Sequence, residues 1–340
     1  CHARRVCDYG GGDRGMAGFL LRRLINYVVL CLLATFLAFA LASLTFEPLA
    51  KLQGRNPPPP AEVVEAKRQE LRLDEPIPQR FSSWLGGAVQ GDFGTTITGV
   101  EITDELVTRV GVTLRLLLIG TTVGVVAGVL VGVASAIRQY RFGDYAATVF
   151  SFAVLSIPVF VMAQLLKFGG LQLNEVAGTT VLYFQGEVTP SFQGSAWDEL
   201  LNRLQHLVLP TLAIVLPQIA YYSRYQRSAM LDVLGSDFLR TARAKGLTRR
   251  RALFKHGLRT ALIPMATLLA FGFGLLLTGS VFIEKIFGWY GMGSWFVDGV
   301  TEQDTNIVAT VTLFAAVLIL ISGWLSDVLY AALDPRIRVA

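Results

Sequence analysis

The sequence is poor in the side chains that most enzymes use for metal and redox chemistry. It has only three cysteines and three histidines in 340 residues. The cysteines show neither metal-ligand spacing nor a plausible disulfide framework, and the histidines are scattered, so neither residue type predicts a metal site. These residues are Cys1, Cys7, Cys31, His2, His206 and His256.

Motifs for nucleotide and hydrolytic chemistry are also missing. The sequence has no G-x-x-x-x-G-K-[ST] loop for nucleotide phosphates, no H-E-x-x-H or G-x-S-x-G motif, and no C-x-x-C pair. We therefore expect no catalytic residues, no cofactor and no metal. An intramembrane enzyme would need a convergent pair of reactive side chains, which the sequence does not indicate.

Charged residues are scarce, at 16% of the chain, whereas 53% of the residues are hydrophobic. The apolar residues form separate runs, each long enough for the roughly 20 residues that cross a ~30 Å hydrocarbon core as a helix. An all-α integral membrane protein with six transmembrane helices is predicted. The expected spans are 19–45, 111–137, 145–169, 206–230, 259–283 and 305–331.

Basic residues lie between these runs, so the net charge of +5 indicates orientation and lipid contact rather than nucleic-acid binding. The loop between the fourth and fifth spans is strongly basic. Because positive loops stay inside, we expect this loop and both termini on the cytoplasmic side of the membrane. The basic residues are Arg224, Arg227, Arg240, Arg243, Lys245, Arg249, Arg250, Arg251, Lys255 and Arg259.

The chain divides into a few expected regions. Residues 1–15 have the composition of a leader or a cloning remnant, and 16–45 form the first transmembrane helix. Residues 46–108 form an external subdomain, in which a proline run precedes a helix over 61–73. A membrane core spans 109–332, with a cytoplasmic loop at 231–258, and 333–340 form a cytoplasmic tail.

The cytoplasmic loop holds the most informative segment, SDFLRTARAKGL. Ser236 or Asp237 can cap a helix of about ten residues, and Gly246 can end it in the left-handed conformation. Small side chains would let a partner approach closely, while Phe238 and Leu239 would form an apolar anchor. The alternative is a solvated linker that is basic only because it faces the cytoplasm.

The residues Thr241 to Leu247, followed by His256, Leu258, Arg259 and Ile263-Pro264, resemble the coupling loop of ABC importer permeases, and most closely the oligopeptide and dipeptide branch. Weaker matches extend over most of the chain from Met16. They are GDFGT at 91–95, SIPVF at 156–160, EKIFGWYGMG at 284–293 and LDPRIR at 333–338. Arg240-Thr241-Ala242 replaces the Glu-Ala-Ala of the broader family, and Tyr290 stands where a proline is usual.

The resemblance implies a type I importer permease, a multi-pass protein of the cytoplasmic (inner) membrane of a bacterium, that does not hydrolyse ATP. Its implied partners are a second permease, two ATPase subunits, an extracytoplasmic peptide-binding protein and membrane lipid, with no nucleic acid. The implied substrate is an oligopeptide or dipeptide, or another solute such as nickel. The implied ATPase-coupling residues are Asp237, Phe238, Thr241, Ala242, Ala244, Lys245, Gly246 and Leu247.

Prolines and glycines in the spans are candidates for a gate or kink. They are Pro158, Pro210, Pro217, Gly272 and Gly274. Proline favours a kink because it removes a backbone donor, although neighbouring helices can also simply tolerate it. The small-xxx-small spacing in the second span, at Gly120, Gly124, Gly128 and Gly132, is interpreted as helix packing. The rival function is an ATP-independent channel or secondary transporter, although the absence of a carboxylate at mid-membrane depth disfavours a proton-driven one.

Overall fold

The computed structural model describes residues 12–54, 57 and 59–333, and these residues form helices joined by loops. Apart from one isolated bridge between Thr95 and Glu101, the described ranges contain no extended pairing. The all-helical class predicted from the apolar runs is therefore confirmed. Of the region 1–15 only 12–15 fall within the description, and of the tail 333–340 only the first residue does.

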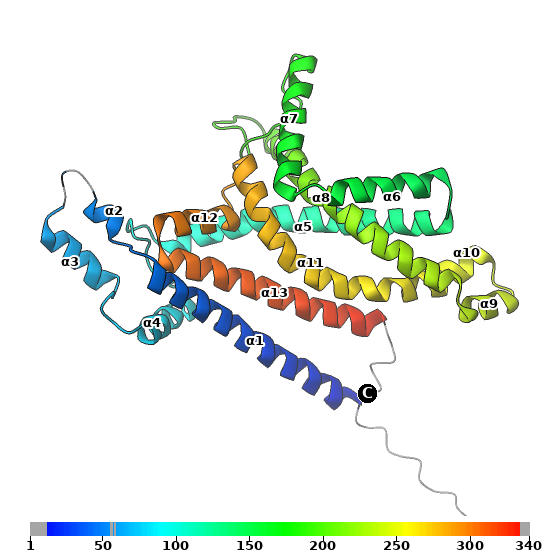
Figure 1. Cartoon of the computed structure of the whole chain (residues 1–340), viewed down its shortest axis with the longest axis horizontal. Coiled ribbons are helices and arrows are strands. Elements are labelled where there is room, and N and C mark those ends of the chain that lie inside the picture. The colour runs from blue at the N-terminus through cyan, green and yellow to red at the C-terminus, as the bar shows by residue number, and fades with distance from the viewer. Residues whose placement is uncertain (1–11, 55–56, 58, 334–340) are drawn as a thin grey trace, which may run out of the picture.

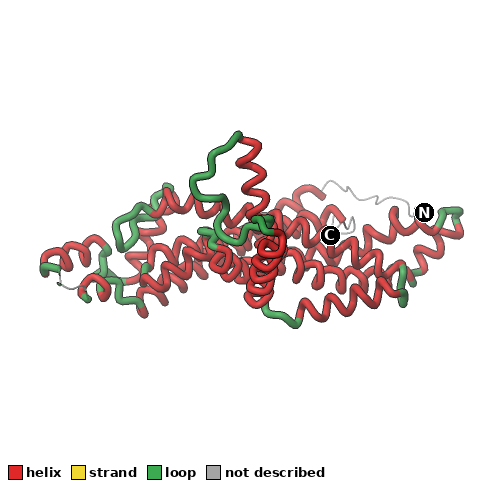
Figure 2. Tube along the Cα trace, turned by 90° about the horizontal axis from the view of Figure 1, so that it is seen from above, coloured by secondary structure: helices red, strands yellow, loops and turns green. Residues whose placement is uncertain are grey.

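Five long helices run along the length of an elongated body (Figures 1 and 2). They are α1 (Gly12–Thr45), α5 (Ile102–Ile137), α8 (Ala196–Leu234), α11 (Leu258–Phe287) and α13 (Thr305–Leu333). Within the described residues, four of them are long and apolar enough to cross a membrane, and the bent pair α6–α7 adds a fifth if it is one span. Some side chains of the 30-residue helix α11 lie outside the description, so six spans remain a prediction.

The third predicted span, 145–169, is not one continuous helix. It consists of α6 (Phe142–Leu155) and α7 (Val159–Ala177), which meet at an angle of 106°. The break falls at Ser156-Ile157-Pro158, where Pro158 precedes the first residue of α7 and has no backbone donor with which to continue α6. As a result, α7 stands away from the body formed by the other long helices (Figure 1).

Short helices gather at one end of the body, opposite the end where α1 begins and α13 finishes (Figure 1). They are α2 (Ala50–Gln53), α3 (Ala61–Glu70), α4 (Ile77–Val89) and α12 (Met292–Glu302). The helix expected over 61–73 thus ends three residues early. Trp84 of α4 packs with Phe39 of α1 and Phe81 in an aromatic cluster that fixes α4 on the long helices.

The core of the bundle is the close packing of α5 on α8. Four glycines at intervals of four residues face α8, and all four are buried. A side chain at Gly128 would meet Tyr222, and one at Gly132 would meet the backbone of Ser223 and Arg227. The spacing had predicted a packing surface, and the structure supplies the reason, because only glycine leaves room for this approach.

Candidate functional site

The helix expected in the loop between the fourth and fifth predicted spans is present as α9 (Asp237–Ala244), which follows α8 after a two-residue turn. It is eight residues long rather than ten. Ser236 occupies the N-cap position, but its hydroxyl donates to the carbonyl of Val233 at 2.6 Å and does not cap α9. The Ser236 hydroxyl, which the sequence analysis offered as a cap for α9, is thus bonded to the end of α8 instead.

The predicted coupling residues lie on two faces of α9. Leu239 is buried and Ala242 is half-buried, and both pack into an apolar cluster with Met230 and Val233 of α8. Phe238, by contrast, is 43% exposed and is not part of this anchor. The inward face therefore fixes α9 to the bundle.

The outward face of α9 is made by residues spaced three to four apart. Phe238, Thr241 and Ala244 are exposed, and Lys245 continues the same face at the C-cap. The Thr241 hydroxyl donates to the carbonyl of Asp237 at 2.9 Å, so it lies along the helix and not outward. This face is slim, carries one exposed aromatic ring and has a cation at its end.

Gly246 ends α9 with a φ of +93°, as the sequence predicted, and its N–H bonds to the carbonyl of Arg243 at 2.9 Å. Leu247 then turns back and packs on the same apolar cluster as Leu239. Thr248 caps the next helix, α10 (Arg249–Ala252), by accepting from the N–H of Arg251. The loop between α9 and α10 is thus held by a glycine, an apolar contact and a cap.

A π-helical turn, Leu253–Gly257, joins α10 to α11 without a break. A side chain on Gly257 would lie 3.1 Å from Val233 and 3.4 Å from Leu239, so this turn packs directly on α8 and α9. Turns of this type insert one extra residue into a helix and often mark functional positions. Helix α10 is therefore continuous with the long helix α11, and α9 packs on the turn that joins them.

The candidate gate residues do not form one cluster. Pro158 lies at the break between α6 and α7, whereas Pro210 and Pro217 lie inside α8, which stays continuous through both. Gly272 of α11 faces the hydroxyl of Tyr222, so a side chain there would collide with the ring of a buried tyrosine. The surroundings of Gly274 lie outside the described residues.

Glu284 was not singled out as a site residue, although it begins the EKIFGWYGMG motif. Its carboxylate is fully buried and accepts from the hydroxyl of Thr113 at 2.8 Å and from the N–H of Ser294 at 2.8 Å. It thus joins α5, α11 and α12. Gly291 and Gly293 lie so close to this carboxylate that a side chain on either would displace it.

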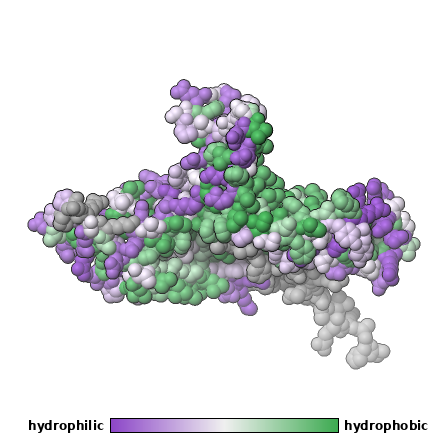
Figure 3. Space-filling model, turned by 45° about the horizontal axis from the view of Figure 1, so that its top comes forward, coloured by the Kyte–Doolittle hydropathy of each residue, from purple (hydrophilic) through white to green (hydrophobic). Residues whose placement is uncertain are grey.

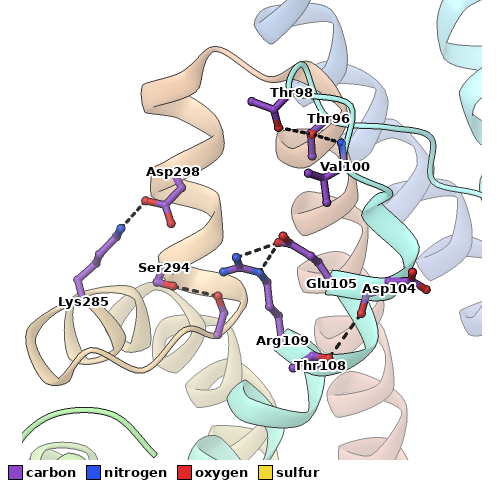
Figure 4. A network of polar contacts seen from close by, with 11 residues as sticks. Thr96, Thr98, Val100, Asp104, Glu105, Thr108, Arg109, Lys285, Ser294 and Asp298 are labelled. Atoms are coloured by element: carbon purple, nitrogen blue, oxygen red, sulfur yellow. Dashed lines mark hydrogen bonds and ion pairs between the residues drawn. The ribbon is translucent and has the colours of Figure 1, made fainter. Parts of the chain in front are cut away.

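Ionic contacts surround this buried junction (Figure 4). Lys285 at the end of α11 pairs with Asp298 of α12 at 2.5 Å. Arg109 of α5 pairs with Glu105 at 2.8 Å and lies over the ring of Trp295. The first pair thus joins α11 to α12, and the contact of Arg109 with Trp295 joins α12 to α5.

A second ionic group was also missed by the sequence analysis. Asp144, 3% exposed at the start of α6, accepts two hydrogen bonds from the guanidinium of Arg227 in α8, at 2.6 and 2.8 Å. The hydroxyl of Ser135 in α5 and the N–H of Tyr140 also bond to this carboxylate. This pair locks α5, α6 and α8 together near the α9 end of the bundle.

None of these groups forms a metal site or a catalytic constellation. No cluster of three or more histidine, cysteine or acidic side chains occurs among residues 12–54, 57 and 59–333. The described residues instead place the exposed helix α9 beside the start of α11 and a buried polar junction at the end of α11.

Comparisons with known proteins agree with this arrangement. Residues 124–339 match the model of the binding-protein-dependent transport system inner membrane component, and residues 16–101 match the model of its N-terminal region. The chain is similar to the oligopeptide transport system permease protein OppB of Mycobacterium tuberculosis (strain ATCC 25618 / H37Rv). The two are 57% identical over 325 residues, which cover 96% of this chain and all of that protein.

Two more distant relatives also align over their whole length. The oligopeptide transport system permease protein AppB of Bacillus subtilis is 34% identical over 332 residues, covering 95% of this chain and 100% of AppB. The glutathione transport system permease protein GsiC of Escherichia coli (strain K12) is 32% identical over 328 residues, which cover 95% of this chain and 99% of GsiC. The chain thus belongs to the family of binding-protein-dependent transport system inner membrane components, and it is a multi-pass membrane permease.

Proposed function

We propose that this permease forms, with a second and similar permease, the translocation path of an ABC importer that takes up oligopeptides or dipeptides. The names of the relatives support a peptide substrate, since two of the three described above are oligopeptide permeases and the third is a glutathione permease. Glutathione is itself a small peptide. Nickel or another solute is the alternative cargo.

The observation that carries the proposal is the construction of α9. Its inner face is anchored by Leu239, its outer face presents Phe238, Thr241 and Ala244, and Gly246 ends it without steric cost. Such a helix is suited to enter a groove on a partner protein. We assign that partner as an ATP-hydrolysing subunit, two of which would serve the permease pair, so that this chain itself hydrolyses no ATP.

The surface of α7 supports a second permease. Phe160, Phe168 and Val176 are 47%, 62% and 89% exposed on a helix that stands away from the body, and the space-filling view shows hydrophobic surface running up this projection (Figure 3). A helix with apolar side chains on its outer surface needs either lipid or another apolar helix around it. A second permease would cover α7 in part.

The distribution of basic residues supports an orientation of the protein in the membrane. The loop that contains α9 and α10 is strongly basic, and the ends of α1 and α13 lie at the same end of the body. We assign this end to the cytoplasm by the positive-inside rule. The opposite end, with α2, α3, α4 and α12, then faces outward, where a peptide-binding protein would deliver its cargo.

The experiment is peptide uptake into proteoliposomes that contain both permeases and both ATPase subunits, with the binding protein and labelled peptide supplied outside the vesicles. We expect uptake to require ATP inside the vesicles and to be outcompeted by unlabelled oligopeptide but not by nickel. Uptake by this permease alone, without ATP, would instead establish the channel or secondary-transporter function. Competition by nickel alone would reassign the cargo.

Gly246→Leu tests the coupling segment in the same assay. We expect it to abolish ATP-dependent uptake, because leucine at a φ of +93° is strained. Gly246→Asn is the matched control, since asparagine enters the left-handed region more readily than other side chains, and it should retain most of the activity. Equal uptake by Gly246→Leu and the wild type would contradict the coupling role.

A further inference from the structure

A small cavity lies between the end of α8, α9 and α10, on the side of α9 that carries Leu239. Its volume is about 100 Å³. The floor is apolar, formed by Leu239, Ala252 and Leu253, all of which are buried. The rim is formed by three arginines, Arg240, Arg243 and Arg249. We refer to this cavity as the arginine pocket.

Among the residues that the structure describes, carboxylates balance little of the charge of the arginine pocket. Arg240 reaches Asp237 only at 3.5 Å, and both side chains are largely exposed to water. No carboxylate pairs with Arg243 or Arg249 in the part of the chain that the structure describes. Three cations around an apolar floor therefore favour an anion in the pocket, and the floor strengthens the attraction because it keeps water from one side.

The size and donor chemistry of the pocket fit a carboxylate. A volume of 100 Å³ is about three times the share of one water molecule in the liquid, which accommodates a carboxyl group and the carbon that carries it. Guanidinium groups bind carboxylates through two parallel hydrogen bonds. A rim of arginines rather than lysines is thus suited to a planar, forked acceptor.

The position of the pocket decides between a lipid and a protein. Figure 1 shows α9 and α10 at the extreme end of the long axis, beyond the ends of α1 and α13, and Figure 3 shows hydrophilic surface gathered at that end. Lipid headgroups surround the ends of the membrane-spanning helices, whereas α9 and α10 extend past the start of α1 and the end of α13. An occupant that approaches from beyond the bundle is a protein in the aqueous phase.

We infer that the arginine pocket receives an acidic side chain of the ATP-hydrolysing subunit, next to the groove that takes α9. The inference rests on the proposed function, since it names a contact of the same docking segment. Because the rim residues come from both α9 and α10, one carboxylate in the pocket would bind the docking helix and the start of the helix that leads into α11 together. A movement of the ATPase subunit that displaces the pocket would therefore also displace the start of α11.

The test is the affinity of the ATPase subunits for the purified permease pair, measured in detergent with Arg243→Glu and Arg249→Glu. We expect each to weaken binding on the order of tenfold to a hundredfold, because charge reversal replaces an attraction with a repulsion. Arg250→Glu is the matched control, since Arg250 is an exposed neighbour outside the pocket, and it should bind almost as the wild type does. Arg243→Lys should weaken binding less than Arg243→Glu.

Rescue identifies the partner residue. Changing the acidic side chain on the ATPase subunit to arginine should restore binding to Arg243→Glu and impair binding to the wild type. Equal affinity of the pocket variants and Arg250→Glu would overturn the inference. So would unchanged ATPase affinity together with lost binding to vesicles that contain phosphatidylglycerol, which would assign the pocket to lipid.

The outcomes separate this inference from the proposed function. If the wild-type pair does not bind ATPase subunits at all, the importer proposal itself is refuted. If the wild type binds and Gly246→Leu abolishes uptake while both pocket variants bind normally, the coupling function of α9 holds and only the arginine pocket is reassigned.

Discussion

The packing of α5 on α8 makes a sharp prediction for Gly132→Ala. A methyl group at this position would lie 2.6 Å from the carbonyl oxygen of Ser223, 2.8 Å from the β-carbon of Gln226 and 3.1 Å from the amide nitrogen of Arg227. Two of these atoms belong to the backbone of α8, so no side-chain rotation relieves the contact. The helices must move apart locally or bend.

The cost follows from this geometry. Forcing one additional methyl into a close-packed interface costs about 1–3 kcal/mol. The gain in helix propensity from glycine to alanine offsets roughly 0.5–1 kcal/mol of it. Gly111→Ala is the control in the same helix, because nothing lies within 4 Å of its added methyl, so only the propensity gain should remain there. The two variants should change stability in opposite directions.

The assay is thermal unfolding of the purified permease in one detergent, monitored by circular dichroism and by the loss of monodisperse protein. We expect Gly132→Ala to lower Tm, by about 2–4 °C for each kcal/mol lost in a domain of 150–250 residues, and Gly111→Ala to leave Tm unchanged or slightly raised. An equal or higher Tm for Gly132→Ala than for Gly111→Ala would refute the proposed contact between α5 and α8.

Further variants at three acidic residues probe the buried polar contacts. Glu284→Ala should lower the free energy of unfolding by at least about 2 kcal/mol, because the hydroxyl of Thr113 and the N–H of Ser294 lose their buried acceptor. Glu284→Gln should be destabilised less than Glu284→Ala when both are measured by thermal unfolding. Asp144→Ala should cost about 2–3 kcal/mol, less than for a fully buried pair because Arg227 is 27% exposed. Removing both partners should restore stability in a double-mutant cycle. At Asp304, between α12 and α13, burial raises the pKa of the carboxyl. The folded state then binds the proton more tightly than the unfolded state, so this group's contribution to stability falls as pH rises from the ordinary carboxyl range through the raised pKa. Asp304→Asn should flatten that decline when Tm is measured against pH.

The charge-poor runs were sufficient to predict the positions of the long helices, but not the break within the third predicted span. Charge-poor runs gave the positions of α1, α5, α8, α11 and α13, because a membrane helix satisfies its own backbone and exposes apolar side chains. The same criterion predicted 145–169 as a single span. A charge-poor run reports only which side chains are present and not where the backbone changes direction. Only Pro158 carried a signal for the break, and proline inside α8 causes none.

The candidate site divides in the same way. Gly246 was predictable because a helix that ends in a residue with positive φ usually has glycine there. The opposite roles of Phe238 and Leu239 were not, because two neighbours on a short helix can exchange faces, and contact with α8 decides which one is buried. Glu284 and Thr113 are 171 residues apart, so no local pattern reports their hydrogen bond.

The unbroken course of α11 has a consequence for how signals cross the membrane. Its 30 residues correspond to about 45 Å along the helix axis, which bends on its way (Figure 1). The helix is continuous with the π-helical turn beside α9 at one end and carries Glu284 near the other. Linkage between two binding events is reciprocal. If, as we propose, a binding protein docks at the Glu284 end and an ATPase subunit at the α9 end, and if docking of one changes the affinity for the other, then each partner must change the other's affinity by the same factor. Each would then respond to whether the other is bound on the opposite side of the membrane.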